Sequence, residues 1–338
     1  MVIIIVVGYK SRKYLADCLS SIFNSTYKNF KVIFVDNDSN DGSIKYIEDN
    51  YKKVIILESK NNLGFAGGNN LGIKKALKLK ADFLLFLNPD TIIDRGCLSS
   101  LIKKADKNTI LQPLILLHEN DKKTDLINTS GGTLNFLGFS YCSNYRKKSE
   151  EISENTEIPV GSGCALFCPV SVIKKIGFFD PVFFTFHEDV DFCWRARLFG
   201  YKILVIPNAL VWHKYEFSRN KNKMFYFERN RLLFLMKNYS PWMMLITFPA
   251  MLINEILMVI FSIMAGWTPL KIKSYFAVFA LLPHVIKERK RINKKEKNYH
   301  QLKTFINSDI SFSEVKVPGL KLYNFLTFCY WSLIKKIV

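Results

Sequence analysis

The chain has 338 residues and a formal net charge of +19, although 49% of its residues are hydrophobic. This length allows one large α/β domain with an appendage, and a core that needs neither disulfides nor a structural metal. So much positive charge beside apolar sequence indicates an anionic membrane, an anionic ligand, or both. We expect no nucleic-acid partner, because the sequence has no RNP, zinc-finger or basic-zipper pattern and its basic residues gather beside apolar segments near the C-terminus.

Seven scattered cysteines are mostly set among apolar neighbours, which predicts buried free thiols and a reducing compartment. They are Cys18, Cys97, Cys142, Cys164, Cys168, Cys193 and Cys329. The spacing of Cys164 and Cys168 allows a zinc site, but no second cysteine pair or nearby histidine supports one. The apolar run 2–7 lacks a basic flank and is too short for a signal peptide, so it predicts a strand.

The first third of the chain alternates short, uncharged apolar runs with segments of helical period. This pattern is typical of a parallel sheet covered on both faces. It predicts strands at 2–7, 31–35, 54–57 and 83–87, and helices near 13–23, 42–50 and 69–79. Loops rich in Gly, Asn and Asp follow these strands, at 36–42, 61–70 and 88–91. Because ligands of open α/β sheets bind at the carboxyl ends of strands, we expect a site there.

The middle of the chain has a weaker pattern. From 111 to 158 it is irregular, and the charged stretch 146–151 predicts a solvated, mobile loop, so we assign no chemistry to this part. Regular structure is expected again at 160–167, followed by a short helix to Gly177, the acidic segment 187–191 and a helix to Phe199. A last strand, 202–206, leads to Val211-Trp212-His213.

The last third predicts membrane contact. Glu255 is the only charged residue within 238–270, and a second uncharged run covers 274–286. The first run exceeds the roughly 20 residues of a spanning helix, but Pro249 and the pair Asn254-Glu255 fall near its middle. A carboxylate in mid-bilayer is costly unless it is paired or protonated. We therefore expect two half-length helices in an interfacial or re-entrant arrangement, with a single span as the alternative.

Two further segments support membrane contact. The stretch 287–297 carries seven positive and two negative residues and suits anionic headgroups, with a solvated linker as the alternative. The stretch 320–337 is amphipathic and rich in Tyr, Phe and Trp, a mix typical of helices at headgroup depth. We therefore expect an α/β domain at 1–238 and a membrane-associating helical region at 239–338.

Several polar residues at the expected sheet edge could carry chemistry. Asp36 could accept hydrogen bonds from a nucleotide base or ribose, although its loop is also ordinary turn sequence. Asn88-Pro89-Asp90 offers oxygen ligands to a hard divalent cation, although Asn-Pro-Asp-Thr is also a good β-turn. His213 could complete the coordination and favour manganese over magnesium, although a lone histidine is more often merely packed.

The acidic segment also has two interpretations. Glu188 and Asp189 stand at an expected helix start, where acids complement the helix dipole, and Asp191 would pair with Arg195 one turn later. The functional alternative makes Asp189 a general base. Its position in the sequence does not decide between the two.

Five segments together resemble the family 2 glycosyltransferases of the GT-A fold, and most closely their rhamnosyltransferase-like branch. They are VDNDSNDG at 35–42, NLGFAGGNNLG at 62–72, FLNPDT at 86–91, GFFD at 177–180 and HEDVDFCWR at 187–195. Each motif alone would be weak, but five in this order are specific. The resemblance covers residues 2 to about 237.

The resemblance implies a Rossmann-like, mostly parallel sheet flanked by helices, and it implies roles for individual residues. Donor contacts would come from Asp36, Asp38, Gly67, Gly68, Asn69, Asn70, Asn88 and Arg195. Asp189 would be the catalytic base, and a divalent cation, Mn²⁺ or Mg²⁺, would bind Asn88, Asp90 and His213. The sequence departs from the family at Lys10, which usually is Asn, and at Asn88, which replaces an Asp of the usual Asp-x-Asp. We therefore expect Asp90 to carry most of the metal binding.

These roles imply an inverting single displacement in which Asp189 deprotonates an acceptor hydroxyl while a nucleoside diphosphate leaves. The expected donor is a nucleotide-diphosphate sugar, with dTDP-rhamnose one candidate. The expected acceptor is a polyprenyl-linked glycan or a polysaccharide, at the cytoplasmic face of an anionic membrane. The sequence leaves the sugar, acceptor and linkage open.

Three alternatives are less favoured. A nicotinamide enzyme would need G-x-G-x-x-G after the first strand, whereas the glycines of 64–72 have another spacing and follow the third. An inactive membrane scaffold with the same fold would not need Asp36, Asp90 and Asp189 intact. A processive polysaccharide synthase would need a Q-x-x-R-W segment and more apolar runs than this sequence offers.

Overall fold

The structure is a computed structural model that describes residues 1–216, 222–293, 299–311 and 319–337. The chain forms two compact units. The first unit comprises 1–132, 142–196 and 201–215, and the second comprises 133–141, 197–200 and the residues from 216 onward. This division differs from the predicted boundary at 238, because helix α7 (Lys223–Asn238) lies in the second unit.

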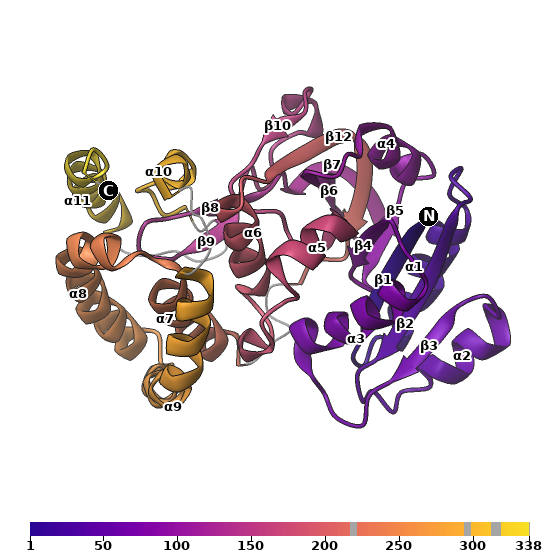
Figure 1. Ribbon diagram of the computed structural model, residues 1–338, viewed down its shortest axis with the longest axis horizontal. Coiled ribbons are helices and arrows are strands. Elements are labelled where there is room, and N and C mark those ends of the chain that lie inside the picture. The colour runs from indigo at the N-terminus through magenta and orange to yellow at the C-terminus, as the bar shows by residue number, and fades with distance from the viewer. Residues whose placement is uncertain (217–221, 294–298, 312–318, 338) are drawn as a thin grey trace. The chain divides into compact units, whose positions relative to one another are not determined.

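The first unit is a β-sheet with helices on both faces (Figure 1). In the described part of the chain the sheet has ten strands: β1 (Val2–Gly8), β2 (Phe30–Asp36), β3 (Ile55–Glu58), β4 (Phe83–Leu87), β5 (Thr91–Ile93), β6 (Thr109–Glu119), β7 (Lys122–Thr129), β10 (Thr156–Glu157), β11 (Ala165–Pro169) and β12 (Lys202–His213). The helices around it are α1 (Leu15–Phe23), α2 (Ser43–Asn50), α3 (Gly64–Lys78), α4 (Cys97–Lys104), α5 (Val170–Ile176) and α6 (Glu188–Leu198), with 3-10 turns η1 (Arg12–Tyr14), η2 (Ser149–Glu151) and η3 (Pro181–Phe183).

The strand order is β10-β12-β6-β11-β4-β1-β2-β3, with β5 paired to β12 and β7 paired to β6. Strands β1 to β4 are mutually parallel where they pair, which confirms the predicted α/β start. Strand β11 runs antiparallel to β4 and β6, and β5, β7 and β10 add further antiparallel pairs. The whole sheet is therefore mixed rather than mostly parallel.

Strand β1 has apolar side chains on both faces because helices cover both. Val2, Ile4 and Val6 pack in a core with residues of α1, α2 and α4. The opposite face approaches α3 so closely that a Cβ added to Gly68 or Gly72 would lie 2.5 Å from a methyl carbon of β1. The glycines of this segment thus let the backbone of α3 lie directly on the sheet, with its N-terminus at the carboxyl ends of the strands.

The prediction of an irregular segment from 111 to 158 was wrong. Strands β6 and β7 form a long antiparallel hairpin whose register shifts twice. These irregularities obscure a two-residue alternation, and β6 itself is almost entirely buried, so its sequence does not alternate either. The charged stretch that follows pairs with this hairpin, for example through Arg146 and Glu119.

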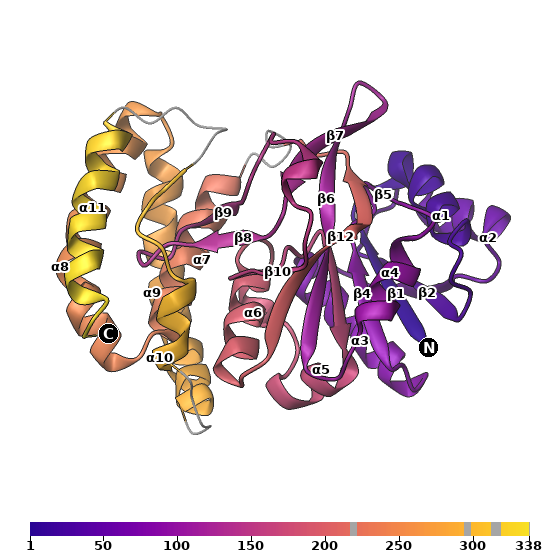
Figure 2. The ribbon, with the colours of Figure 1, turned by 90° about the horizontal axis from the view of Figure 1, so that it is seen from above.

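The second unit consists of helices and a short hairpin, β8 (Gly132–Leu134) with β9 (Ser140–Cys142). Its helices are α7, α8 (Pro241–Met264), α9 (Thr268–Asn293), α10 (Tyr299–Leu302) and α11 (Leu320–Ile334), with the 3-10 turn η5 (Lys303–Phe305). Helices α8 and α11 lie side by side (Figure 2), and the hydroxyl of Tyr330 donates to the carbonyl of Ile246 at 2.6 Å.

Helix α8 is continuous, so the prediction of two half-length helices was wrong. Pro249 removes one backbone donor, but it lies on the exposed side of a helix that continues through it from Pro241 to Met264. Helices α8 and α9 are both long and apolar enough to cross a membrane, judged by length and composition. The predicted basic segment begins as the last turns of α9, while residues 294–297 lie outside the described part of the chain.

Candidate active site

The candidate site residues gather at one edge of the sheet. Strands β2, β4 and β12 end at this edge, and β11 begins there because it runs antiparallel to β4. The loops that carry Asp36, Asp90, Gly163 and His213 therefore meet, together with the N-terminus of α3. This arrangement is the one expected for the carboxyl ends of an open α/β sheet.

Asp36 ends β2 and is buried. One carboxylate oxygen accepts a hydrogen bond from the backbone N–H of Ser39 at 3.1 Å, which is the turn predicted as its structural role. Its other oxygen, Oδ1, has no hydrogen-bond partner among the described residues. Asp36 can therefore hold its turn and still accept a hydrogen bond from a ligand. Asp38 is partly exposed with a positive φ, and its predicted donor contact stays a prediction.

Asn37 connects the Asp36 loop to the start of α3. Its Nδ2 donates to the carbonyl of Gly64 at 3.1 Å, and its Oδ1 accepts from the N–H of Leu63 at 2.9 Å. Lys10, where the sequence departs from the family, lies in the same group of loops and donates its N–H to Ser39 Oγ at 3.2 Å. These bonds fix the distance between the β2 loop and α3.

A strained loop covers the N-terminus of α3. Phe184, Phe186 and His187 all have φ angles between 62° and 66°, which is rare outside glycine. The carbonyl of Phe184 accepts from Ala66 N at 3.2 Å, and a Cβ on Gly64 would lie 2.3 Å from that carbonyl. The glycine thus allows the loop that precedes Asp189 to close over α3.

The predicted donor-binding residues of α3 have different surroundings. Gly68 and Asn69 are buried, and the Asn69 amide donates to the carbonyl of Phe65 within the helix. Asn70 is partly exposed, and its side-chain amide binds the backbone of Phe179. Its Nδ2 donates to the carbonyl of Phe179 at 2.9 Å, and its Oδ1 accepts from the N–H of Phe179 at 3.1 Å. Gly67 is also partly exposed. These contacts give Gly68 and Asn69 packing roles, and the donor contacts of all four residues stay predictions.

Asp90 and His213 lie side by side, as the metal hypothesis requires. Strand β12 pairs with β5 so that His213 is opposite Thr91, and His213 Nε2 lies 3.4 Å from Asp90 Oδ1. Asn88 is partly exposed, and its backbone carbonyl accepts from Thr91 Oγ1 at 2.6 Å. Among the described residues, no group of three His, Cys, Asp or Glu side chains could hold a metal. A carboxylate and an imidazole nevertheless fit Mn²⁺ or Mg²⁺, whose remaining ligands come from substrate phosphates and water.

Asn128 orients the His213 ring. This residue of β7 is buried, and its Oδ1 lies 2.9 Å from His213 Nδ1. The contact directs Nε2 toward Asp90, as the outer partners of metal-binding histidines do. Burial alone would lower the pKa of His213, but Cys164 and Asp90 raise it to about 10. Without a cation, the protonated imidazole therefore neutralises Asp90.

Asp189 lies at the first turn of α6, between the helix and the loop before β11. Its Oδ2 accepts from Gly163 N at 2.9 Å, and its Oδ1 accepts from Val190 N at 2.8 Å. Burial raises the pKa of Asp189, and the two N–H groups oppose this shift only in part. Gly163 also lies against Phe65, so Asp189 faces the N-terminal turn of α3.

Arg195 has a structural role in this geometry. The guanidinium is buried and donates to Asp191 Oδ2 at 2.9 Å and to the carbonyls of Ile176 and Phe178, each at 3.0 Å. These bonds join α6 to the end of α5. The predicted contact of Arg195 with the sugar-nucleotide donor stays a prediction, and this geometry does not favour it.

Sequence reasoning assigned no role to Asn37, Asn128 or Gly163, and it gave Glu188 only a helix-dipole role. Glu188 is buried, and its Oε2 has no hydrogen-bond partner among the described residues. Burial and the neighbouring Asp189 raise the pKa of Glu188 well above its ordinary value. Gly163 stands in a polar Gly-Ser-Gly loop just before a buried strand, and this pattern could have predicted its place at the edge of the sheet. The sequence gives no such signal for Asn128, because its partner His213 is 85 residues away in the chain.

The prediction of mostly buried free thiols agrees with the structure, in which all seven cysteines are free. Five of them are buried, Cys142 is partly exposed and Cys329 is exposed. Cys164 and Cys168 lie near and on β11, and neither belongs to a metal-binding group among the described residues.

Comparison with known proteins assigns the class. Residues 3–177, about half of the chain, match the family described as "Glycosyl transferase family 2", and the chain therefore belongs to this family. A crystal structure of GalNAc-T7 with UDP, GalNAc and Mn²⁺ has a TM-score of 0.59 at 16% identity, over 70% of this chain and 48% of that one. At this identity the likeness supports the GT-A fold alone.

Two curated relatives are similar in sequence. The low-salt glycan biosynthesis hexosyltransferase Agl10 of Haloferax volcanii is 26% identical over 57% of this chain, and the match spans 61% of its own length. The N-acetylglucosaminyl-diphospho-decaprenol L-rhamnosyltransferase of Mycobacterium tuberculosis is 26% identical over 71% of this chain and 85% of its own length. The predicted resemblance to family 2, with rhamnosyltransferases among its relatives, is confirmed.

Proposed function

We propose that the chain is an inverting, metal-dependent glycosyltransferase that adds one sugar from a nucleotide-diphosphate sugar to a polyprenyl-linked or polysaccharide acceptor. The observation that carries this proposal is the meeting of Asp36, Asp90, His213 and Asp189 at one edge of a family 2 domain. Named relatives act in glycan synthesis and transfer hexose or rhamnose. This supports a glycan acceptor and keeps dTDP-rhamnose as a candidate donor.

Asp90 and His213, with the nearby Asn88, would hold the divalent cation. Bound there, the cation would neutralise the negative charge of the departing diphosphate. Asn128 keeps the imidazole turned toward Asp90. Asp36 would accept a hydrogen bond from the nucleoside through its open oxygen.

Asp189 would take the proton of the acceptor hydroxyl. Its two backbone hydrogen bonds fix the carboxylate, and its raised pKa makes it a stronger base than an ordinary aspartate. Attack from the side opposite the leaving diphosphate inverts the anomeric configuration. The strained loop and Phe65 beside Asp189 help to exclude water, which would otherwise compete with the acceptor.

We also propose that the second unit holds the enzyme at the cytoplasmic face of a membrane, where sugar nucleotides are made. The support is the pair of long apolar helices and the basic end of α9.

The metal role is tested by removing the metal and its ligands. We expect release of nucleoside diphosphate to stop with a chelator and to return with Mn²⁺ or Mg²⁺. Asp90→Ala should lose far more activity than Asn88→Ala, because a carboxylate binds a hard cation better than an amide. Asn128→Ala should weaken Mn²⁺ binding about 10- to 100-fold, the usual effect of losing an outer partner.

Mn²⁺ binding is measured by electron paramagnetic resonance in the presence of nucleoside diphosphate, and folding by thermal melting. Asn155→Ser, in an exposed loop, is the control and should change neither measurement. Full activity in chelator, or equal losses at Asp90 and Asn88, would remove the metal assignment.

A further inference from the structure

Three helices of the second unit bury polar residues and expose large apolar ones, the reverse of the pattern in a water-soluble protein. The side of α8 that faces its neighbours carries Thr247, Asn254 and Ser262, all fully or almost fully buried. Its outer side carries large apolar residues that are 42–65% exposed: Trp242, Leu245, Phe248, Leu252, Ile253, Ile256, Leu257, Ile260 and Ile263. A core helix of a soluble protein has the opposite distribution.

Helices α9 and α11 repeat this pattern. On α9 the polar Lys271 and Ser274 are buried, whereas Phe276 and Phe279 are about three-quarters exposed. On α11 Thr327 is buried and Leu333 is exposed. Because α11 runs beside α8 and α8 beside α9, we define the apolar face as the exposed apolar residues of these three helices (Figure 2).

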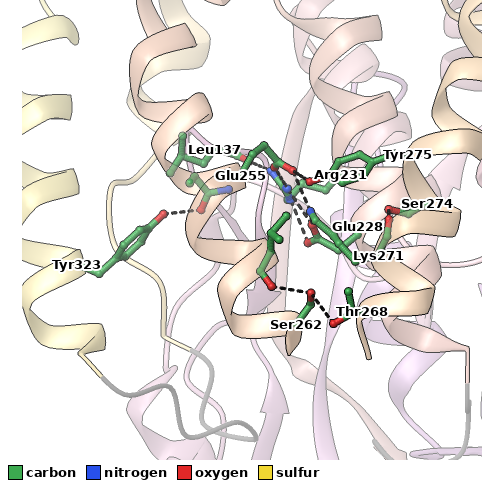
Figure 3. Close-up of polar contacts among 12 residues, drawn as sticks. Leu137, Glu228, Arg231, Glu255, Ser262, Thr268, Lys271, Ser274, Tyr275 and Tyr323 are labelled. Atoms are coloured by element: carbon green, nitrogen blue, oxygen red, sulfur yellow. Dashed lines mark hydrogen bonds and ion pairs between the residues drawn. The ribbon is translucent and has the colours of Figure 1, made fainter. Parts of the chain in front are cut away.

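A network of buried ion pairs lies behind the apolar face (Figure 3). Glu228 and Arg231 of α7, Glu255 of α8 and Lys271 of α9 contact one another, with Lys271 Nζ at 2.8 Å from Glu255 Oε2. Tyr275 also donates to Glu255 Oε2 at 2.7 Å. Two negative and two positive charges make the network neutral. Glu255, the charge that argued against a span, is thus paired with residues of two other helices.

Helix α7 packs against α9 and contacts it near both ends of its apolar run. Glu228 pairs with Lys271 near one end, and Met236 O accepts from Arg289 at 2.5 Å near the other. Lys271 and Arg289 are eighteen positions apart on α9, about 27 Å of helix and close to the thickness of a hydrocarbon core, whereas Glu228 and Met236 are eight positions, about 12 Å, apart on α7. If α9 crossed a bilayer, the part of α7 that is paired to it would enter the bilayer with Glu228 and Arg231, at a high cost.

We infer that the second unit binds an anionic lipid leaflet as one prefolded body, through the apolar face alone, and that neither α8 nor α9 spans the bilayer. Exposed Lys287, Lys290 and Arg291 at the end of α9 provide the attraction to anionic headgroups. The network keeps α7 on the side away from lipid. This inference rests on the membrane association proposed above and specifies its geometry.

Sidedness is tested with the full chain in spheroplasts of an expressing bacterium. Ala265, exposed in the turn between α8 and α9, is replaced by Cys in a Cys329→Ser background. A membrane-impermeant maleimide should label Ala265→Cys only after permeabilisation. Labelling from outside would show a spanning hairpin and overturn the inference. Labelling only in detergent would show a re-entrant turn inside the bilayer and would also overturn it.

The face is tested by flotation with vesicles of phosphatidylglycerol and phosphatidylethanolamine. Phe276→Lys with Phe279→Lys should reduce vesicle binding at least about tenfold, because two charges would enter the leaflet, and Leu333→Lys on α11 should reduce it in the same direction. Asn155→Lys, exposed in the first unit, adds one positive charge elsewhere, as Leu333→Lys does on α11, and should have no effect. Circular dichroism confirms folding of each variant.

Unchanged vesicle binding in both face variants would overturn the inference. A full-length protein that stays monomeric in buffer and never binds vesicles would instead refute membrane association itself. The two failures are therefore distinct.

Discussion

Glu188 and Asp189 are neighbours in the chain, but their surroundings separate their roles. Asp189 accepts two backbone hydrogen bonds, which stabilise its ionised form. Glu188 is buried, its Oε2 has no partner among the described residues, and burial together with Asp189 raises its pKa. Asp189 is therefore the carboxylate whose ionised form the structure stabilises better.

Asp189→Asn should lower turnover by at least about a hundredfold, because the amide keeps the shape but cannot accept the proton. Donor affinity should remain nearly unchanged. In the wild type, kcat/KM should fall as pH falls through the pKa of Asp189, because only the ionised form is a base. Since burial raises that pKa, the fall should begin above the range of an ordinary aspartate.

The measurement is a pH profile of nucleoside diphosphate release, with Glu188→Gln as the matched variant. The Gln variant should keep the acidic limb of the profile. If Glu188→Gln removed the limb and Asp189→Asn kept wild-type turnover, the base would be Glu188.

Local contacts could be predicted from the sequence where both partners belong to one motif, as for the turn that Asp36 makes with Ser39. The roles of Asp36, Asp90 and Asp189 toward donor, metal and acceptor came from the family resemblance and stay predictions. Asn128 could not be found, because the register shifts of β7 decide that it reaches His213. Arg195 was given a donor contact by resemblance, and the carbonyls that bind it become its neighbours only when α5 and α6 pack.

At the scale of elements, apolar runs without interruption predicted β1 to β4 and the helices between them, because burial on both faces leaves a plain signal. The β6–β7 hairpin was missed because its pairing is irregular. Helix α8 was expected to break at Pro249 and Glu255. It does not break, because Glu255 is paired with Arg231 and Lys271, which lie outside the apolar run.

The network predicts a contrast between two ion pairs of the second unit. Glu228→Gln should lower the free energy of unfolding in detergent by about 3 kcal/mol or more, because it leaves Arg231 and Lys271 buried with one carboxylate fewer. Glu288→Gln breaks a pair whose Arg291 is half exposed, and it should cost at most about 1 kcal/mol. Equal effects in chemical denaturation would contradict the proposed role of the network.

At the scale of the whole molecule, the chain joins a GT-A unit to a helical unit whose apolar side chains face outward. The net charge of +19 fits both an anionic diphosphate and an anionic leaflet. The family could be recognised from sequence because its motifs cluster in the first unit. The compact units divide near residue 216 rather than at the predicted 238, because α7 packs with the helices that follow it, in part through Glu228 and Arg231.

The proposed function requires this chain to cleave a nucleotide-diphosphate sugar at the Asp90–His213 edge of its sheet. The most direct measurement incubates the full-length protein in lipid with a panel of sugar nucleotides and Mn²⁺, and quantifies the nucleoside diphosphate and the anomeric configuration of the freed or transferred sugar. We predict release from one donor class, inversion of configuration, and loss of release in Asp90→Ala. Release from no donor by a folded, nucleotide-binding protein would indicate an inactive scaffold, and retention of configuration would contradict the single displacement.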